Sequence, residues 1–164
     1  MGMKLLGWQQ ARKELQKGLD IFSSRNYATI GIHEDAGSVK DGSESQAQNG
    51  AKQNFGDPHN TLNGSPAPIP ARPWLIPGVE SAKGDILDIV EQQIKNGSSL
   101  DHTLDGIGLV AVGAVQQYMT DLKTPPNSGY TIAKKGSSNP LIDTGSMRAA
   151  VTYKITSEKP EEGI

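Results

Sequence analysis

The sequence predicts an α+β domain in which a small, mainly antiparallel sheet packs against two long helices. Two periodicities carry this expectation. Apolar residues recur at helical spacing over 78–95 and 100–122, and they alternate over 27–33 and 149–155. Strands separated by long helices are typical of helices packed on one small sheet. The length of 164 residues suits a single domain spanning 1–164.

The N-terminal part begins with an expected amphipathic helix over 4–24, followed by the strand over 27–33. The apolar face of that strand would carry Ala28, Ile30 and Ile32. Residues 34–66 differ in character, because they are rich in Gly, Ser, Asn, Gln and Asp and contain few large apolar side chains. We expect an extended, mobile arm here, with a short helix around 45–54.

The central part is expected to hold both long helices. Prolines punctuate 66–78, so this stretch is predicted as an extended edge segment that leads into the helix over 78–95. That helix would turn Val79, Ala82, Ile86, Leu87, Val90 and Ile94 to one side. The helix over 100–122 should be the most buried, since its middle is apolar nearly all round.

Three glycines interrupt the helix expected over 100–122. Gly106, Gly108 and Gly113 would each lower helix propensity by about 1 kcal/mol. We expect them to be tolerated where another element packs very close to this helix.

The C-terminal part follows the break at Pro125-Pro126. We expect a short helix over 128–135 and a helical turn over 143–147, capped by Asp143 or Thr144. The final strand over 149–155 would place Val151, Tyr153 and Ile155 on one face. Residues 157–164 are polar and are expected to form a flexible tail.

Composition argues against several classes of site. The chain has no cysteine, which excludes disulfides, thiolate metal sites and cysteine nucleophiles. Its formal net charge of −2 gives no reason to expect a duplex-binding surface. The longest apolar run, 106–115, is well short of the roughly 20 residues of a membrane span. We expect no cofactor and no membrane association.

Two short motifs have catalytic or metal-binding alternatives. Asp143-Thr144-Gly145 resembles the active-site loop of aspartic proteases, but that chemistry needs two such aspartates and the chain has one copy. His33-Glu34-Asp35 resembles part of a metal cluster, yet adjacent strand residues point to opposite faces. We therefore expect no enzyme, and an aspartic-protease-like activity is the least favoured alternative.

Several residues are candidates for contacts with other proteins. Trp74 is either a core anchor, which we favour, or an interface anchor. The Lys134-Lys135 pair lies beside a glycine and is expected to be a solvated turn, with contact to a phosphate or an acidic partner as the alternative. The candidate interface residues are Phe55, Arg72, Trp74, Lys134, Lys135 and Arg148.

Three ordered segments carry a resemblance to a known family. They are 69–77 (Ile-Pro-Ala-Arg-Pro-Trp-Leu-Ile-Pro), 125–137 (beginning Pro-Pro-Asn-Ser and ending Thr-Ile-Ala-Lys-Lys-Gly-Ser) and 140–148 (Pro-Leu-Ile-Asp-Thr-Gly-Ser-Met-Arg). In this order and spacing they resemble the neck and tail-completion proteins of tailed bacteriophages, also described as virion morphogenesis or tail-terminator-like proteins. The long loop before Ile69 departs from the family pattern.

This resemblance implies a structural role in the virion. Such proteins form homo-oligomeric rings at the head–tail interface, which join the head connector to the tail or cap the tail tube. For this chain a hexamer is favoured and a dodecamer is the alternative. The implied partners are portal-side connector proteins, tail tube or tail terminator proteins, and genomic DNA that passes without sequence-specific binding. Assembly would take place in the cytoplasm of a host bacterium. A DNA-binding or packaging-accessory module is the alternative function.

Overall fold

The computed structural model describes residues 12, 13, 16, 25–40 and 42–160. The helix expected over 4–24 lies outside the described residues, apart from Arg12, Lys13 and Gln16, which are helical. Of the expected flexible tail, 161–164 also lie outside them.

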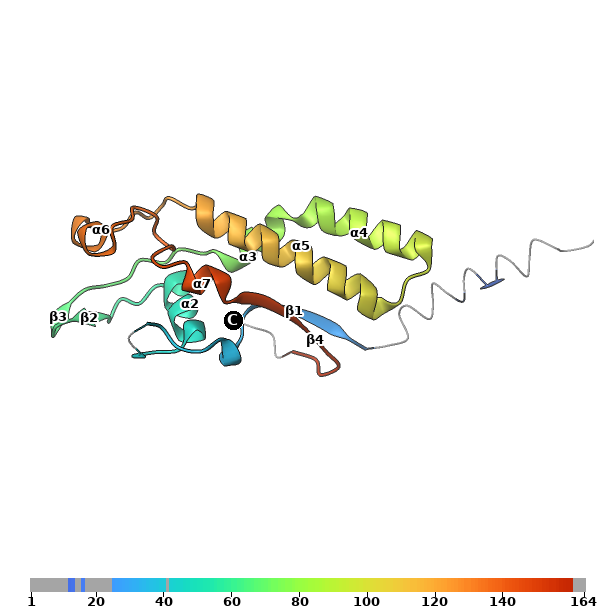
Figure 1. The fold of residues 1–164 in the computed structure, drawn as a ribbon, viewed down its shortest axis with the longest axis horizontal. Coiled ribbons are helices and arrows are strands. Elements are labelled where there is room, and N and C mark those ends of the chain that lie inside the picture. Colours follow the sequence, from blue (N-terminus) through green and yellow to red (C-terminus); the bar gives the residue numbers. More distant parts are fainter. Residues whose placement is uncertain (1–11, 14–15, 17–24, 41, 161–164) are drawn as a thin grey trace, which may run out of the picture.

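The described chain forms a layered α+β fold, which confirms the predicted class (Figure 1). Strands β1 (Tyr27–Ile32) and β4 (Val151–Thr156) pair antiparallel, with Ile32 opposite Val151 and Tyr27 opposite Thr156. Helix α5 (Leu100–Asp121) lies between this sheet and helix α4 (Lys83–Asn96), and helix α3 (Leu75–Ser81) packs against α5 with Leu75 next to β1. Strands from near the two ends of the described chain therefore meet beneath α5.

The core is assembled from segments far apart in the sequence. Trp74, Val115, Met119, Leu141, Met147 and Val151 form its buried cluster. Ile30 and Ile32 of β1 pack against this cluster from the sheet side, which confirms the predicted apolar face of that strand. Helix α5 is central, as expected, but it is not buried all round, because Leu109 is 60% exposed.

Close approaches explain two of the three glycines in α5. A Cβ atom on Gly108 would lie 2.3 Å from the ring of Tyr153, and one on Gly106 would lie 3.3 Å from Ile89. Gly113 has no neighbouring atom within 4 Å of that position, so no close packing accounts for it. The missing side chain of Gly108 is thus what lets β4 approach α5.

The single helix expected over 78–95 is two helices that meet at Ala82. Helix α3 begins earlier, at Leu75, and Ala82 leaves helical geometry with φ −91° and ψ 4°. Ala82 is 1% exposed, whereas Leu87 is 58% and Ile94 43% exposed. The placement of Leu87 and Ile94 on a buried side was wrong, because α4 lies outside α5 and none of its residues is buried.

Residues 34–66 contain more secondary structure than the extended arm that we expected. The short helix is confirmed as α2 (Gln46–Phe55), with a capping box between Ser45 and Gln48. It follows the 3-10 turn η1 (Glu34–Ala36), whose Asp35 pairs with Lys154 of β4 at 2.7 Å. Helix α2 packs through a small residue, since a Cβ atom on Gly50 would lie 2.8 Å from Ile32 and 3.3 Å from Trp74. The large apolar partners of α2 thus come from outside the segment.

A tight hairpin forms the exposed part of this segment. Strands β2 (Thr61–Leu62) and β3 (Ser65–Pro66) pair across Asn63 and Gly64, which have φ of 52° and 77°. Positive φ at both central residues is the geometry of a type I′ turn. All six residues are exposed, and the hairpin lies at one end of the molecule (Figure 1).

Two short helices complete the fold before β4. Helix α6 (Gly129–Lys135) is capped by the Ser128 side chain, in agreement with the predicted 128–135. Helix α7 (Ser146–Ala149) begins later than the expected turn at 143–147, and its N-cap Gly145 has no side-chain bond. Thr144 still accepts a hydrogen bond from the Ser146 amide through Oγ1, at 3.3 Å. Among the described helices, none has the length and apolar character of a membrane span.

Candidate functional site

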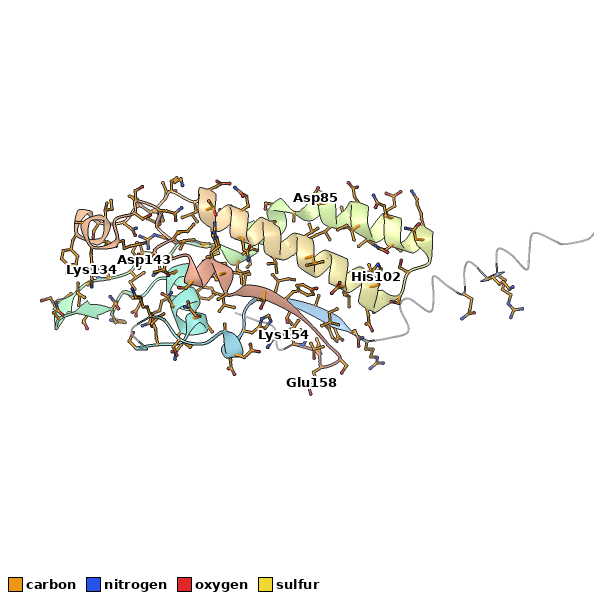
Figure 2. All side chains as sticks on the ribbon, viewed as in Figure 1. Asp85, His102, Lys134, Asp143, Lys154 and Glu158 are labelled. Carbon is orange, nitrogen blue, oxygen red and sulfur yellow. The ribbon has the colours of Figure 1, made fainter. Side chains whose placement is uncertain are left out.

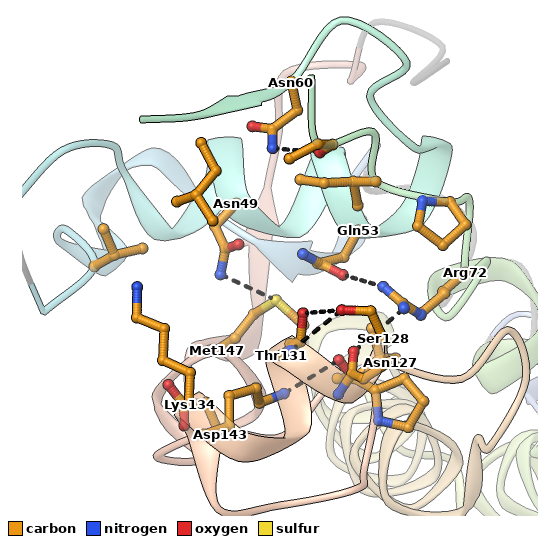
Figure 3. Close-up of a pocket in the computed structure, with 18 of the residues that line it drawn as sticks. Asn49, Gln53, Asn60, Arg72, Asn127, Ser128, Thr131, Lys134, Asp143 and Met147 are labelled. Atoms are coloured by element: carbon orange, nitrogen blue, oxygen red, sulfur yellow. Dashed lines mark hydrogen bonds between the residues drawn. The ribbon is translucent and has the colours of Figure 1, made fainter. Parts of the chain in front are cut away.

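Arg72, from the proline-rich segment, joins three parts of the chain. Its side chain is almost fully buried and donates hydrogen bonds to the carbonyl oxygens of Pro125 at 2.8 Å and Pro126 at 3.2 Å. It also donates to the side chains of Gln53 at 2.9 Å and Asn127 at 3.3 Å (Figure 3). These four acceptors are neutral, so burial lowers the pKa of the guanidinium below its ordinary value.

Trp74 fixes the start of α3 against α2. Its side chain is 3% exposed, and its Nε1 donates to the carbonyl of Gly50 at 3.1 Å. The amides of Trp74 and Leu75 both donate to the side-chain oxygen of Asn54, at 3.0 and 3.3 Å. The backbone donors at this helix start, which carries no N-cap side-chain bond, therefore receive an acceptor from α2.

Asn139 organises the third segment of the resemblance. Its side-chain oxygen accepts hydrogen bonds from the amides of Leu141 and Ile142, both at 3.0 Å. Its side-chain nitrogen donates to the carbonyl of Thr120, at the end of α5, at 2.7 Å. Asn127 in turn donates to the Asn139 carbonyl at 3.1 Å. We call the set Arg72, Trp74, Asn127, Lys135 and Asn139 the motif network.

Lys135 closes the motif network from α6. Its ammonium lies 3.1 Å from the Asn139 carbonyl and 3.5 Å from the Pro140 carbonyl. Burial lowers the pKa of this lysine, and the charge of Arg72 acts in the same direction, while Asp143 opposes both. Two cations, the buried Arg72 and the half-buried Lys135, therefore lie close together at this end of the molecule.

An open groove runs over the motif network, between α2 and the hairpin on one side and α6 and α7 on the other (Figure 3). Its volume is about 1290 Å³. The exposed side chains that line it include Lys40, Leu62, Tyr130, Lys134 and Asp143. It is thus wide, partly apolar and open to solvent, which suits a macromolecular contact better than an enclosed small-molecule site.

The groove carries a positive charge excess. Glu44 at its edge is already paired with Lys52 at 2.6 Å, and Asp143 is the other carboxylate that lines it. Against these stand Lys40, Arg72, Lys134 and Lys135. Within the described part of the chain, Lys134 has no ion pair with a carboxylate. The groove therefore presents an exposed cation beside apolar side chains.

The candidate interface residues divide into exposed and buried groups. Phe55, at the end of α2, is 57% exposed, and Lys134 is exposed in the groove. Arg72 and Trp74 lie in the interior, so the structure places them behind the surface and not on it. Lys135 and Arg148 are half-buried, and Arg148 donates to Thr120 Oγ1 at 3.0 Å. For Trp74, the favoured core position is confirmed.

The motifs with catalytic alternatives have other surroundings. Asp143 is exposed at the groove, where its charge raises the pKa of Lys135 against the effect of burial. The His33 ring lies between Thr29 Oγ1 at 3.1 Å and Thr152 Oγ1 at 3.0 Å, so it links β1 to β4. In the described ranges, no three His, Cys, Asp or Glu side chains converge as a metal site.

The amide side chains that hold the motif network together are not predicted by any sequence motif. Gln53, Asn54, Asn127 and Asn139 each accept or donate bonds between distant segments. Gln53 and Asn54 lie in the polar stretch that was expected to be an arm. In the sequence, these two residues are marked only by their place in a short predicted helix before a proline-rich segment, which is a weak signal.

Comparisons of the chain with protein-family models, with curated proteins and with solved structures gave no match. The proposed function therefore rests on the geometry of the motif network and the groove.

Proposed function

We propose that this chain is a structural subunit of the head–tail interface of a tailed bacteriophage. It would form a ring that joins the head connector to the tail or caps the tail tube. The observation that carries the proposal is the motif network. Arg72 bonds segment 69–77 to segment 125–137, and Asn139, which lies between 125–137 and 140–148, bonds to both.

This bonding bears on the resemblance itself. Each of the three segments is a weak signal when taken alone. Arg72 needs the carbonyls of Pro125 and Pro126, and Asn127 and Lys135 need the carbonyl of Asn139. The three segments therefore belong to one folded unit, in which each depends on hydrogen bonds with the others. This supports reading them together as one resemblance.

The shape of the described chain also suits a ring subunit. The hairpin and α6, whose residues line the groove, lie at one end, and α4 lies towards the other (Figure 1). Closed rings need two different surfaces on each subunit that bind each other. We propose a hexamer, with a dodecamer as the alternative, in contact with the connector on one side and tail proteins on the other. With a net charge of −2, the ring would let DNA pass without gripping it.

Electron microscopy of phage particles tests this proposal. We expect a phage that lacks the gene to accumulate separate heads and tails, and a plasmid copy to restore complete particles. Gold-labelled antibody against the chain should mark the neck of complete virions. Absence of the chain from purified virions would contradict the proposal. Duplex affinity that falls steeply with salt, in a chain that is not part of the virion, would favour the DNA-binding alternative.

A further inference from the structure

The large exposed apolar side chains fall mainly into two separate groups. In one group, Leu62 and Tyr130 line the groove, and Phe55 of α2 and Ile132 of α6 lie on the helices that flank it. The other lies on the helical layer and consists of Ile76, Leu87, Ile94 and Leu109. Single exposed apolar residues are ordinary, but grouped ones often mark contact surfaces.

The groove combines apolar and cationic side chains on one wall. Tyr130 and Lys134 are four residues apart in α6, so they lie on the same face of the helix. Tyr130 is 61% exposed, and Leu62 of the hairpin, also in the groove, is 39% exposed. A partner that fills this groove should therefore bring apolar side chains and a carboxylate close together.

One edge of α4 has that combination. Leu87, Glu91 and Ile94 follow the spacing i, i+4, i+7, which places them in one stripe along the helix. Leu87 and Ile94 are exposed, and the Glu91 side chain is 63% exposed, with only its neighbour Lys95 as its ion-pair partner among the described residues. An exposed pair of this kind contributes little to stability, so Glu91 is available to a second cation.

The charges of the two regions are also opposite. Residues 75–121, which contain α3, α4 and α5, hold seven acidic and two basic side chains. The groove has the positive excess described above. Figure 2 shows Asp85 on the outer side of α4 and Lys134 at the far end of the molecule. The acidic helices and the positively charged groove therefore cannot contact each other within one copy.

We propose that the α4 edge of one copy binds in the groove of the next copy. Leu87 and Ile94 would pack on Tyr130 and Leu62, and Glu91 would lie beside Lys134. An apolar stripe at i, i+4, i+7 is the usual way in which a helix occupies a groove. The contact joins two different surfaces, so it repeats around an axis and leaves no groove empty in a closed ring. This inference rests on the proposed ring and names the surfaces that build it.

Cross-linking tests the contact directly, because a chain without cysteine carries only the thiols that are introduced. Glu91→Cys and Lys134→Cys would be purified separately, mixed and treated with a short bismaleimide. We expect a linked dimer in the mixture and little in either variant alone. The control replaces Lys134→Cys by Lys123→Cys, on an exposed lysine outside the groove, and should give little linked product.

Charge reversal gives an independent measurement. Lys134→Glu or Glu91→Lys alone should weaken self-association in sedimentation velocity by about tenfold or more. The double variant should recover most of the loss, whereas Lys123→Glu with Glu158→Lys should leave association unchanged. A chain that stays monomeric, or single reversals without effect, would overturn the inference. Rings at the virion neck that do not cross-link through these positions would overturn it and leave the head–tail role intact.

Discussion

At the scale of single residues, Arg72 shows how a buried charge specifies a fold. Arg72 is 5% exposed, and its guanidinium bonds to four neutral acceptors. A planar fork with several donors suits carbonyl groups that come from different directions, and a lysine lacks this geometry. Arg72 thereby holds the proline-rich segment, the end of α2 and the chain after α5 in one arrangement.

We expect Arg72→Ala to lower the free energy of unfolding by about 2–4 kcal/mol, because buried acceptors lose their donor. Arg72→Lys should recover only part of this loss. The matched control is Lys134→Ala, an exposed lysine of the same groove, which should stay within about 0.5 kcal/mol of the parent. Urea denaturation measures all three. An Arg72→Ala variant as stable as the parent would show that the network is not a stabilising unit.

His33 links protonation to stability at the sheet. Burial lowers the pKa of His33 below its ordinary value of 6.5, the nearby charge of Lys154 lowers it further, and Asp35 partly opposes both. The unfolded chain therefore takes up this proton at a higher pH than the folded chain. The stability that neutral His33 contributes is present above pH 6.5 and is lost as the pH falls below it.

We expect the free energy of unfolding to fall between about pH 7 and pH 5, with part of the slope due to His33. His33→Gln stays neutral across this range, so its slope should be smaller than that of the parent. Urea denaturation at a series of pH values measures the difference. Equal slopes in the two proteins would mean that His33 does not titrate differently in the folded chain.

At the scale of elements, α5 is packed closely by neighbouring elements at glycine positions. Tyr153 of β4 packs on Gly108, and Val115 approaches Gly78 of α3, where a Cβ atom would lie 2.9 Å from the Val115 Cα. Small residues thus let both the sheet and α3 come close to the buried face of α5. The cost in helix propensity, about 1 kcal/mol for each glycine, is offset by the apolar surface that close packing buries.

Two glycines of the same helix allow a matched comparison. Gly108→Ala should lower the free energy of unfolding by about 1–3 kcal/mol, because the new methyl group overlaps the Tyr153 ring. Gly113→Ala has open space and should raise it by about 0.5–1 kcal/mol through better helix propensity. Thermal and urea denaturation measure both. If both variants were stabilised, the close packing of β4 on α5 would be wrong.

At the scale of the whole molecule, residues 34–66 are divided between the body and its surface. Helix α2 is docked through Gly50 and the Trp74 indole, while the hairpin of β2 and β3 is exposed throughout. Two-residue strands with no covering element open easily. The hairpin also supplies Leu62 to the groove that we propose as an assembly contact.

Hydrogen exchange should separate these two parts. We expect the amides of α2 to be protected in the isolated chain, and those of 61–66 to exchange fast until the ring assembles. Mass spectrometry of monomer and assembly measures this at the level of peptides. Equal exchange of 61–66 in both states would argue against a role of the hairpin in assembly. Fast exchange of the α2 amides would instead support the mobile arm that the sequence predicts.

Local patterns in the sequence were sufficient for the elements that depend on their own residues. The alternation over 27–33 and 149–155, the helix over 100–122, the short helices near 45–54 and 128–135, and the α+β class all follow from periodicity, capping and propensity. These features depend on contacts between residues close in the chain, so they can be predicted from a single sequence.

Tertiary structure alone decided the break at Ala82, the docking of α2, the burial of Arg72 and the groove. Each of these depends on partners far away in the chain: Val115 for Gly78, Trp74 for Gly50, and Pro125 to Asn127 for Arg72. Whether a polar stretch such as 46–55 packs or extends is set by apolar side chains that it does not itself contain. The sequence alone thus identified the segments, and long-range packing determined which of their residues reach the surface.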